Sequence, residues 1–265
     1  MKFSLIYFSL LVFLITVEGY AQNINPEKPV HLFEVKMMAR DVFQSAKWYA
    51  KHLNFKVTKS KHREFVILEN GDFTLHIVTA KQTITASQVR MTPNKERING
   101  FYELGFLCND LDSLMYQYEG REIRRLKEPG FDMDYKTKTV VLADPDGNRV
   151  KLFQASKDQI PTINYFKANF ISITTSDLET GVRWYQTNFG FKEVLKNYSK
   201  DSNITLSILK NNDMTIELQE LSGRTMEITE LLSNQIELTG FNVITLSDGQ
   251  ELIDITDNDG NKFKY

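Results

Sequence analysis

The segment DPDGNRVKLF, residues 144–153, joins a turn to a short strand that carries two basic side chains. Alternate side chains of a strand point to opposite faces, so Val150 and Leu152 face one way while Arg149, Lys151 and Phe153 face the other. A buried cation is costly unless it is paired. We therefore expect the second face of this strand to hold groups that accommodate two cations.

The elements around this strand are built from a repeat. Two runs, DVFQSAKWYAKHLNFKV and DLETGVRWYQTNFGFKEV, begin at Asp41 and Asp177 and lie 136 residues apart. Each begins with Asp, a preferred N-cap, and continues with apolar residues at helical spacing. Each ends at Asn54 or Gly190, residue types that tolerate the left-handed conformation. The pattern predicts two equivalent amphipathic helices, in which we interpret the Trp-Tyr pair as packing against a sheet.

Strand-like runs surround these helices in a fixed order, which gives a β-α-β-β-β unit. The sequence contains three complete units and one truncated unit, at residues 30–80, 100–158, 165–221 and 236–265. We therefore predict an α+β protein of two tandem domains, residues 30–158 and 159–265, of which the second is reduced. Paired units are expected to form curved mixed sheets around a cleft.

The paired βαβββ units, the helix pattern and the closing DPDGN turn together resemble the vicinal oxygen chelate superfamily. This superfamily includes glyoxalase I, bleomycin- and fosfomycin-resistance proteins and extradiol dioxygenases. The resemblance covers nearly all of the chain after the first 21 residues. It implies clefts in which the first and last strands of each unit hold a divalent metal. It does not select one activity, because the same fold serves lyases, isomerases, dioxygenases and binding proteins.

The resemblance also implies which positions carry the site. In the first domain these positions are Glu34 and Glu103 on first strands and His76 and Lys151 on last strands. The equivalent positions of the second domain are unsuited to such a metal, and they are Phe170, Glu217, Phe241 and Lys264. With the second cation of the opening strand included, the residues expected to line the ligand cleft are Glu34, His76, Glu103, Arg149 and Lys151.

Glu34, His76 and Glu103 form an acceptable three-ligand set for a divalent ion of Fe, Mn, Zn or Ni. Lys151 opposes this interpretation, because a protonated ammonium repels a metal cation and a lysine can ligate only as a neutral amine. We favour an arrangement without a cofactor, in which Lys151 lies between Glu34 and Glu103 and satisfies both carboxylates. The metal-bound arrangement is kept as the alternative.

The preferred function is recognition of a small organic ligand in this cleft. It includes metal-free proton transfer, with Glu34 or Glu103 as the base and Lys151 as an electrostatic stabiliser. One alternative is a metal-dependent lyase, isomerase or dioxygenase, and another is a structural or interaction protein with a vestigial cleft. The charged segment 121–138 is interpreted either as a lid over the cleft or as a solvated loop.

The start of the chain and its composition set the remaining expectations. Residues 1–21 combine Lys2, an apolar run too short for the ~20 residues of a membrane span, and small residues before a cleavage point. We predict a signal peptide, a short tail at 22–29, and export to the periplasm or secretion. With 32 basic and 34 acidic residues, no nucleic-acid partner is expected. After cleavage we expect no membrane partner, and either a monomer with intrachain domain pairing or a homodimer.

Overall fold

The computed structural model describes most of the chain beyond the N-terminal segment. The described residues are 30–80, 83–84, 97–98, 100–156, 166–199, 204–221, 225–226, 237–238, 240–247, 254–257 and 262–264. The predicted signal peptide and tail, residues 1–29, lie outside them. Among the described helices, none has both the length and the apolar character needed to cross a bilayer.

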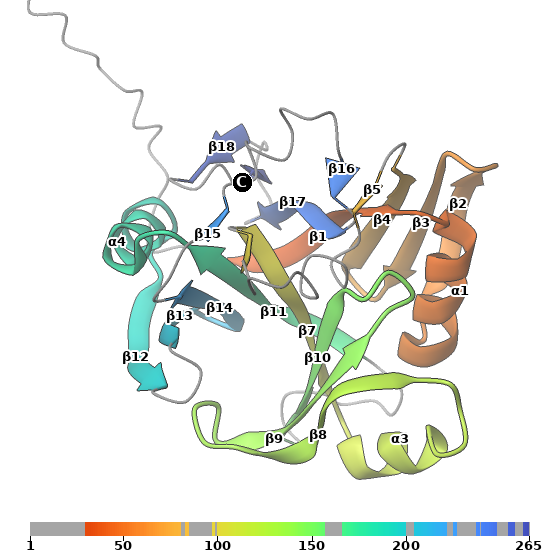
Figure 1. Cartoon of the computed structure of the whole chain (residues 1–265), viewed down its shortest axis with the longest axis horizontal. Coiled ribbons are helices and arrows are strands. Elements are labelled where there is room, and N and C mark those ends of the chain that lie inside the picture. The colour runs from red at the N-terminus through yellow and green to blue at the C-terminus, as the bar shows by residue number, and fades with distance from the viewer. Residues whose placement is uncertain are drawn as a thin grey trace, which may run out of the picture.

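A seven-stranded sheet, called sheet A, combines the first unit with strands from the C-terminal end of the chain (Figure 1). Its order is β18-β19-β17-β1-β4-β3-β2. The strands are β1 His31–Ala39, β2 Lys56–Lys61, β3 Phe65–Asn70, β4 Phe73–Thr79, β17 Gly240–Ser247, β18 Asp254–Thr256 and β19 Lys262–Lys264. Strand β1 is parallel to β4 and antiparallel to β17, so it joins the two parts of the sheet.

An eight-stranded sheet, called sheet D, combines the second and third units in the order β12-β13-β14-β11-β7-β10-β9-β8. Its strands are β7 Gly100–Cys108, β8 Arg124–Asp132, β9 Thr137–Ala143, β10 Arg149–Gln154, β11 Phe166–Thr175, β12 Lys192–Ser199, β13 Ile204–Asn211 and β14 Met214–Leu221. The antiparallel pair β7 and β11 lies at its centre. Two further short pairs are β6 Arg97–Ile98 with β15 Thr225–Met226, and β5 Thr83–Ile84 with β16 Glu237–Leu238.

The predicted repeat helices are confirmed as α1, Val42–Leu53, and α4, Leu178–Phe189. The carboxylates of Asp41 and Asp177 accept backbone N–H groups of the first turn, as an N-cap does. Both C-caps, Asn54 at φ 55° and Gly190 at φ 64°, adopt the left-handed conformation that the sequence predicts. A shorter helix, α3, spans Leu111–Gln117 in the second unit.

One hydrophobic core joins the helix-bearing faces of the two sheets. Phe106 of β7 packs edge-to-face on both Phe55 and Phe73 of the first unit, with ring centres 5.9 and 5.8 Å apart. The alternate side chains of β7 and β10 therefore point to the opposite face of sheet D. That face, which we call the helix-free face, carries Glu103, Gly105, Arg149 and Lys151.

The units pair in a different order from the one predicted. The first unit shares a sheet with the fourth, and the second shares a sheet with the third. The two units of the segment 30–158 therefore do not build one curved sheet together, and that expectation is wrong. The physical reason is that every first strand offers a similar unpaired edge, so a repeat defines the units without defining which edges meet. The residue bounds of the two domains stay predictions.

The motifs of the repeat link the two sheets. The Tyr49 hydroxyl of α1, beside sheet A, donates to the Asp144 carboxylate of the DPDGN turn in sheet D, at 3.3 Å. In the same way the Tyr185 hydroxyl of α4, beside sheet D, donates to Asp257, at 2.7 Å. The tyrosine of each Trp-Tyr pair is fully buried or nearly so. These tyrosines thus have a structural role in joining the sheets.

Candidate functional site

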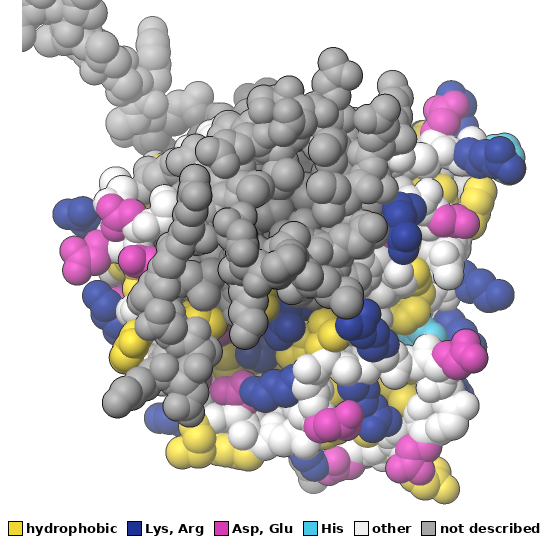
Figure 2. All heavy atoms as spheres, viewed as in Figure 1, with side chains coloured by type: hydrophobic (Ala, Val, Ile, Leu, Met, Phe, Trp, Pro, Cys, Tyr) yellow, Lys and Arg dark blue, Asp and Glu magenta, His cyan; other side chains and the backbone are white. Residues whose placement is uncertain are grey.

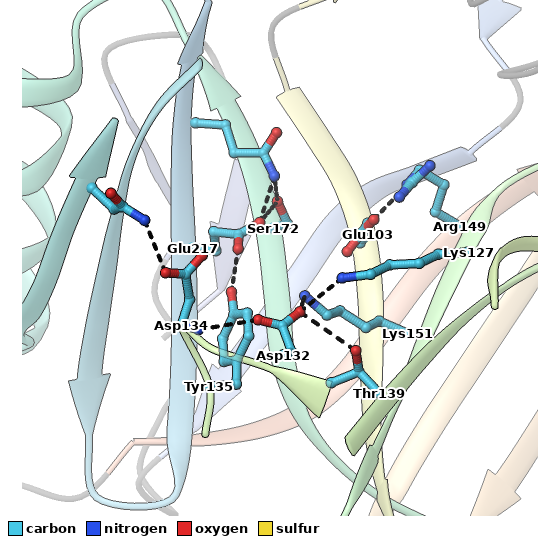
Figure 3. Close-up of polar contacts among 12 residues, drawn as sticks. Glu103, Lys127, Asp132, Asp134, Tyr135, Thr139, Arg149, Lys151, Ser172 and Glu217 are labelled. Atoms are coloured by element: carbon cyan, nitrogen blue, oxygen red, sulfur yellow. Dashed lines mark hydrogen bonds and ion pairs between the residues drawn. The ribbon is translucent and has the colours of Figure 1, made fainter. Parts of the chain in front are cut away.

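Four strands of sheet D bring polar side chains into one row on the helix-free face (Figure 3). Strand register places Arg149 beside Glu103, Glu103 beside Ser172, and Ser172 beside Glu217. Residues opposite one another on neighbouring strands have Cβ atoms ~5 Å apart, so long polar side chains reach each other directly. The row therefore spans both units and contains two carboxylates.

The first carboxylate, Glu103, is paired with Arg149. The Arg149 Nε donates to Glu103 Oε1, and Glu103 is almost fully buried. The guanidinium carbon lies 4.9 Å from the centre of the Tyr102 ring. Burial alone would lower the pKa of Arg149, but the negative charge of Glu103 outweighs it and raises that pKa. The pair is thus held ionised within the sheet.

The second carboxylate, Glu217, accepts hydrogen bonds on both oxygens. Its Oε2 accepts the Tyr135 hydroxyl, while its Oε1 accepts the Ser172 hydroxyl at 2.8 Å and the Gln219 amide. Burial, followed by the charge of Glu217 and this hydrogen bond, raises the pKa of Tyr135 well above its ordinary value. Tyr135 is therefore a protonated donor at neutral pH.

Lys151 lies between these pairs in a different setting from the one predicted. Its ammonium is 3.6 Å from Asp132 Oδ2 and sits over the Tyr135 ring, 4.0 Å from the ring centre. The rings of Phe153 and Phe170 are 5.2 and 5.4 Å away. Aromatic faces attract cations, and more strongly where water is excluded. The prediction that Lys151 lies between Glu34 and Glu103 is wrong, because Asp132 and the three rings surround it.

Asp132, at the end of β8, forms ion pairs with two lysines. Lys127 Nζ donates to its Oδ2 at 3.0 Å, and Thr139 donates to the same oxygen at 3.4 Å. Burial raises the pKa of this carboxyl, but the charge of Lys151 and the contacts of Lys127 outweigh it and lower the pKa. Asp132 is thus held in its ionised form as the carboxylate partner of both lysines.

Phe170 fills the space beside Lys151. A Cβ atom on Gly105 would lie 2.5 Å from Phe170 Cδ1 and 2.9 Å from Phe153 Cε2, distances that real contacts do not reach. The ring therefore occupies the volume that a side chain at position 105 would need. Leu107, Phe153, Ala155 and Phe170 form a small apolar cluster of their own, against which Tyr135 packs.

The segment 121–138, interpreted from sequence as a lid or a loop, forms the hairpin of β8 and β9. The tip of this hairpin carries Asp132, Asp134 and Tyr135. The Asn197 amide of β12 donates to Asp134 at 2.9 Å, so the two outer strands of sheet D meet there. The sheet thus curls until its hairpin tip reaches the third unit.

Glu34 and His76 lie in sheet A and form a separate pair. His76 Nδ1 is 3.9 Å from Glu34 Oε1, and both side chains are partly exposed. Burial lowers the pKa of His76, and the opposing charge of Glu34 does not compensate. His76 is therefore a neutral imidazole at neutral pH, and its buried Nε2 has no hydrogen-bond partner among the described residues.

The five predicted site residues therefore divide between two sheets. Glu103, Arg149 and Lys151 come together in sheet D, whereas Glu34 and His76 lie in sheet A. The predicted three-ligand set of Glu34, His76 and Glu103 does not form, because its members belong to different sheets. Whether any of these residues binds a ligand stays a prediction.

The residues at the implied metal positions of sheet D do not fit a metal. These positions hold Glu103, Lys151, Phe170 and Glu217, which offer two carboxylates, an ammonium and a ring. Both carboxylates already accept hydrogen bonds from protein donors. Within the described residues, no three side chains of His, Cys, Asp or Glu are grouped so that they could hold a metal ion.

Sequence reasoning missed three members of the site. Glu217 was recognised as an equivalent position but was assigned to a different cleft from Glu103. Tyr135 entered the prediction only as an aromatic residue of the lid or loop at 121–138, and Asp132 lies in the same segment, which carries no motif. The signal for Glu217 was the constant spacing of the repeat, whereas Asp132 and Tyr135 reach the site only because the sheet curls.

The family model for the Glyoxalase/Bleomycin resistance protein/Dioxygenase superfamily matches residues 30–152. Residues 30–152 belong to this superfamily. No curated protein matches the chain.

Solved structures of the superfamily fold extend the likeness to most of the chain. Glyoxalase I from Zea mays has a TM-score of 0.61 and 15% identity, with 89% of this chain and 91% of that chain covered. A putative dioxygenase from Bacillus subtilis has a TM-score of 0.62 and 9% identity, with 90% of this chain and 85% of that chain covered. At such identities the likeness shows the fold alone.

Proposed function

We propose that this superfamily member is exported and binds a small organic ligand on the helix-free face of sheet D, without a divalent metal. The observation that carries the proposal is the setting of Lys151. Its ammonium occupies one of the four implied metal positions and is held there by Asp132 and the Tyr135 ring. An internal cation thus takes the part of the site that a metal would need.

The two carboxylates support the same proposal. Glu103 is engaged by Arg149, and Glu217 by Tyr135 and Ser172. A metal would have to displace these donors and overcome the repulsion of two neighbouring cations, Arg149 and Lys151. Binding without a metal requires neither change.

The face also offers the mixed chemistry of a small-molecule site. Ligand sites are mostly apolar and contain a few well-placed polar groups. Here the partly buried Tyr135 ring, which packs on Phe153 and Phe170, provides apolar surface, and Arg149 provides fixed donors. The likeness to glyoxalase I concerns the fold and adds no activity to this proposal.

A fragment library tested on the mature protein examines the proposal. We expect hits to shift the backbone NMR signals of β7, β10, β11 and β14, and to raise the unfolding temperature. A Phe170→Ala variant should bind these hits more weakly, while Phe131→Ala, which changes an exposed ring on the outside of β8, should bind them normally. Hits that act only on other surfaces, or no hits at all, would contradict the proposal.

A further inference from the structure

We infer that the ligand carries an oxyanion group, such as a carboxylate, and that the guanidinium of Arg149 binds it. This inference rests on the proposed function and adds the chemical class of the ligand. It follows from a comparison of the acidic and basic side chains of the site, in their exposure to solvent and in the partners that they already have.

The acidic groups of the helix-free face are hidden. The side chain of Glu103 is 4% exposed and that of Asp132 is 9% exposed, and the residue Glu217 is 4% exposed. Each is also engaged by at least one protein donor. A cationic ligand would therefore find no carboxylate that is both accessible and in need of a partner.

Two of the three basic groups of the same face are more accessible, whereas Lys151 is as buried as Asp132, with 7% and 9% of the side chains exposed. The side chain of Arg149 is 19% exposed and that of Lys127 is 50% exposed. Figure 2 shows Lys and Arg side chains over the region in which Figure 1 places β8 and β10, interspersed with hydrophobic, Asp and Glu side chains. Arg149 and Lys127 thus present more of their side chains to solvent than Glu103 and Asp132 do.

Arg149 has more N–H donors than it uses in hydrogen bonds to the described residues. A guanidinium carries five N–H donors in a planar fork, and among the described residues Arg149 uses only its Nε, toward Glu103. The two terminal nitrogens carry the other four donors, and their spacing matches that of two oxygens in a carboxylate or a phosphonate. The Tyr102 ring, 4.9 Å from the guanidinium carbon, supports the plane of the fork.

The orientation is fixed before binding. Glu103 and Tyr102 hold the guanidinium on two sides, so an incoming oxyanion does not need to order a free side chain. Lys151 and Lys127 lie nearby around Asp132 and add attraction for the same charge. The remainder of the ligand would lie against the Tyr135 ring, which is only partly buried.

A charge-sorted fragment library tests this inference. Matched aromatic carboxylates, phosphonates, amides and amines are compared by thermal shift and NMR on the mature protein. We expect carboxylates or phosphonates to bind, and the two classes will show which oxyanion is preferred. The neutral amides should bind about tenfold more weakly or not at all, since a charge-assisted bidentate pair is lost.

Variants identify the binding group. Arg149→Gln leaves buried Glu103 unpaired, so the double variant Arg149→Gln with Glu103→Gln removes the pair together and keeps the site neutral. Oxyanion binding should fall at least about tenfold in the double variant and stay unchanged in Arg125→Gln, an arginine of β8 paired with Glu128.

The outcomes separate this inference from the proposed function. Hits on the helix-free face that are neutral or cationic, or oxyanion hits that survive the double variant, would overturn the role of Arg149 but keep ligand binding. A complete lack of hits on this face would overturn both.

Discussion

The ammonium of Lys151 lies 4.0 Å from the centre of the Tyr135 ring, at a position where the superfamily resemblance implies a metal ligand. The same tyrosine donates its hydroxyl to Glu217, at another of these positions. Tyr135 therefore engages two of the four positions at once, one with its ring and one with its hydroxyl.

Tyr135 offers a way to separate its two contacts. Tyr135→Phe keeps the ring over Lys151 but removes a donor from buried Glu217, so it should lower the free energy of unfolding by about 1–3 kcal/mol. Tyr135→Leu should cost more, because the cation–π contact and the ring packing are also lost. Urea unfolding measures both. Tyr116→Phe, at an exposed tyrosine, is the matched control, and a Tyr135→Phe value equal to this control would contradict the account.

Gly105 should be intolerant of even a methyl group. Gly105→Ala places a Cβ 2.5 Å from Phe170, so we expect a loss of about 1–3 kcal/mol in the free energy of unfolding. Gly130→Ala in β8, where the nearest atom is 3.9 Å away, should change little. The double variant Gly105→Ala with Phe170→Leu should recover part of the loss. Equal stability of the two single alanine variants would show that Phe170 does not occupy this space.

Asp144 should impose a pH dependence on stability. Burial raises its pKa to about 6, above the value of ~4 in an unfolded chain. Between pH 4 and 6 the folded state therefore binds more protons than the unfolded state, so the contribution of Asp144 to stability falls as pH rises through this window. It then stays constant above pH 6.

The measurement compares wild type with Asp144→Asn. The difference in the free energy of unfolding, wild type minus variant, should fall by about 2–3 kcal/mol from pH 4 to pH 7. His52 titrates in the opposite direction, because burial lowers its pKa to about 4. Its contribution is present in both proteins and cancels when the free energy of the variant is subtracted from that of the wild type. A difference that does not vary with pH would mean that Asp144 titrates normally.

Export gives a prediction on the N-terminal segment. Residues 1–21 have the charge, apolar run and small residues of a signal peptide, so a secreted or periplasmic product should begin at Gln22. Mass spectrometry of the protein from a bacterial periplasmic extract checks this. Retention of the full N-terminus, or recovery in the membrane fraction only, would contradict it.

Local features of this fold could be predicted from the sequence, whereas the pairing of distant elements could not. The caps at Asp41 and Asn54 and the role of the repeat helices follow from chemistry within a few residues. Strand β7 pairs with β11 and not with β1. The sequence does not predict this pairing, because the edges of these two first strands look alike in the sequence.

The same division applies to the site. Glu103 and Lys151 could be identified because the repeat fixes their positions on first and last strands. Asp132 and Tyr135 could not, because their approach depends on the curl of the sheet and on the contact of Asp134 with Asn197. The expected partners of Lys151 were therefore wrong, because its carboxylate partner is Asp132.

Metal titration of the mature protein tests the central claim most directly. Wild type, Lys151→Glu and Lys127→Glu are each exposed to Fe(II), Mn(II), Zn(II) and Ni(II), dialysed and analysed for bound metal, with circular dichroism to verify folding. Lys127→Glu matches the charge change at a lysine that also contacts Asp132 but is half exposed.

We predict that wild type and Lys127→Glu retain well below one ion per chain and that Lys151→Glu gains a site. Tight, stoichiometric metal in the wild-type protein would contradict the claim that Lys151 stands in place of a metal.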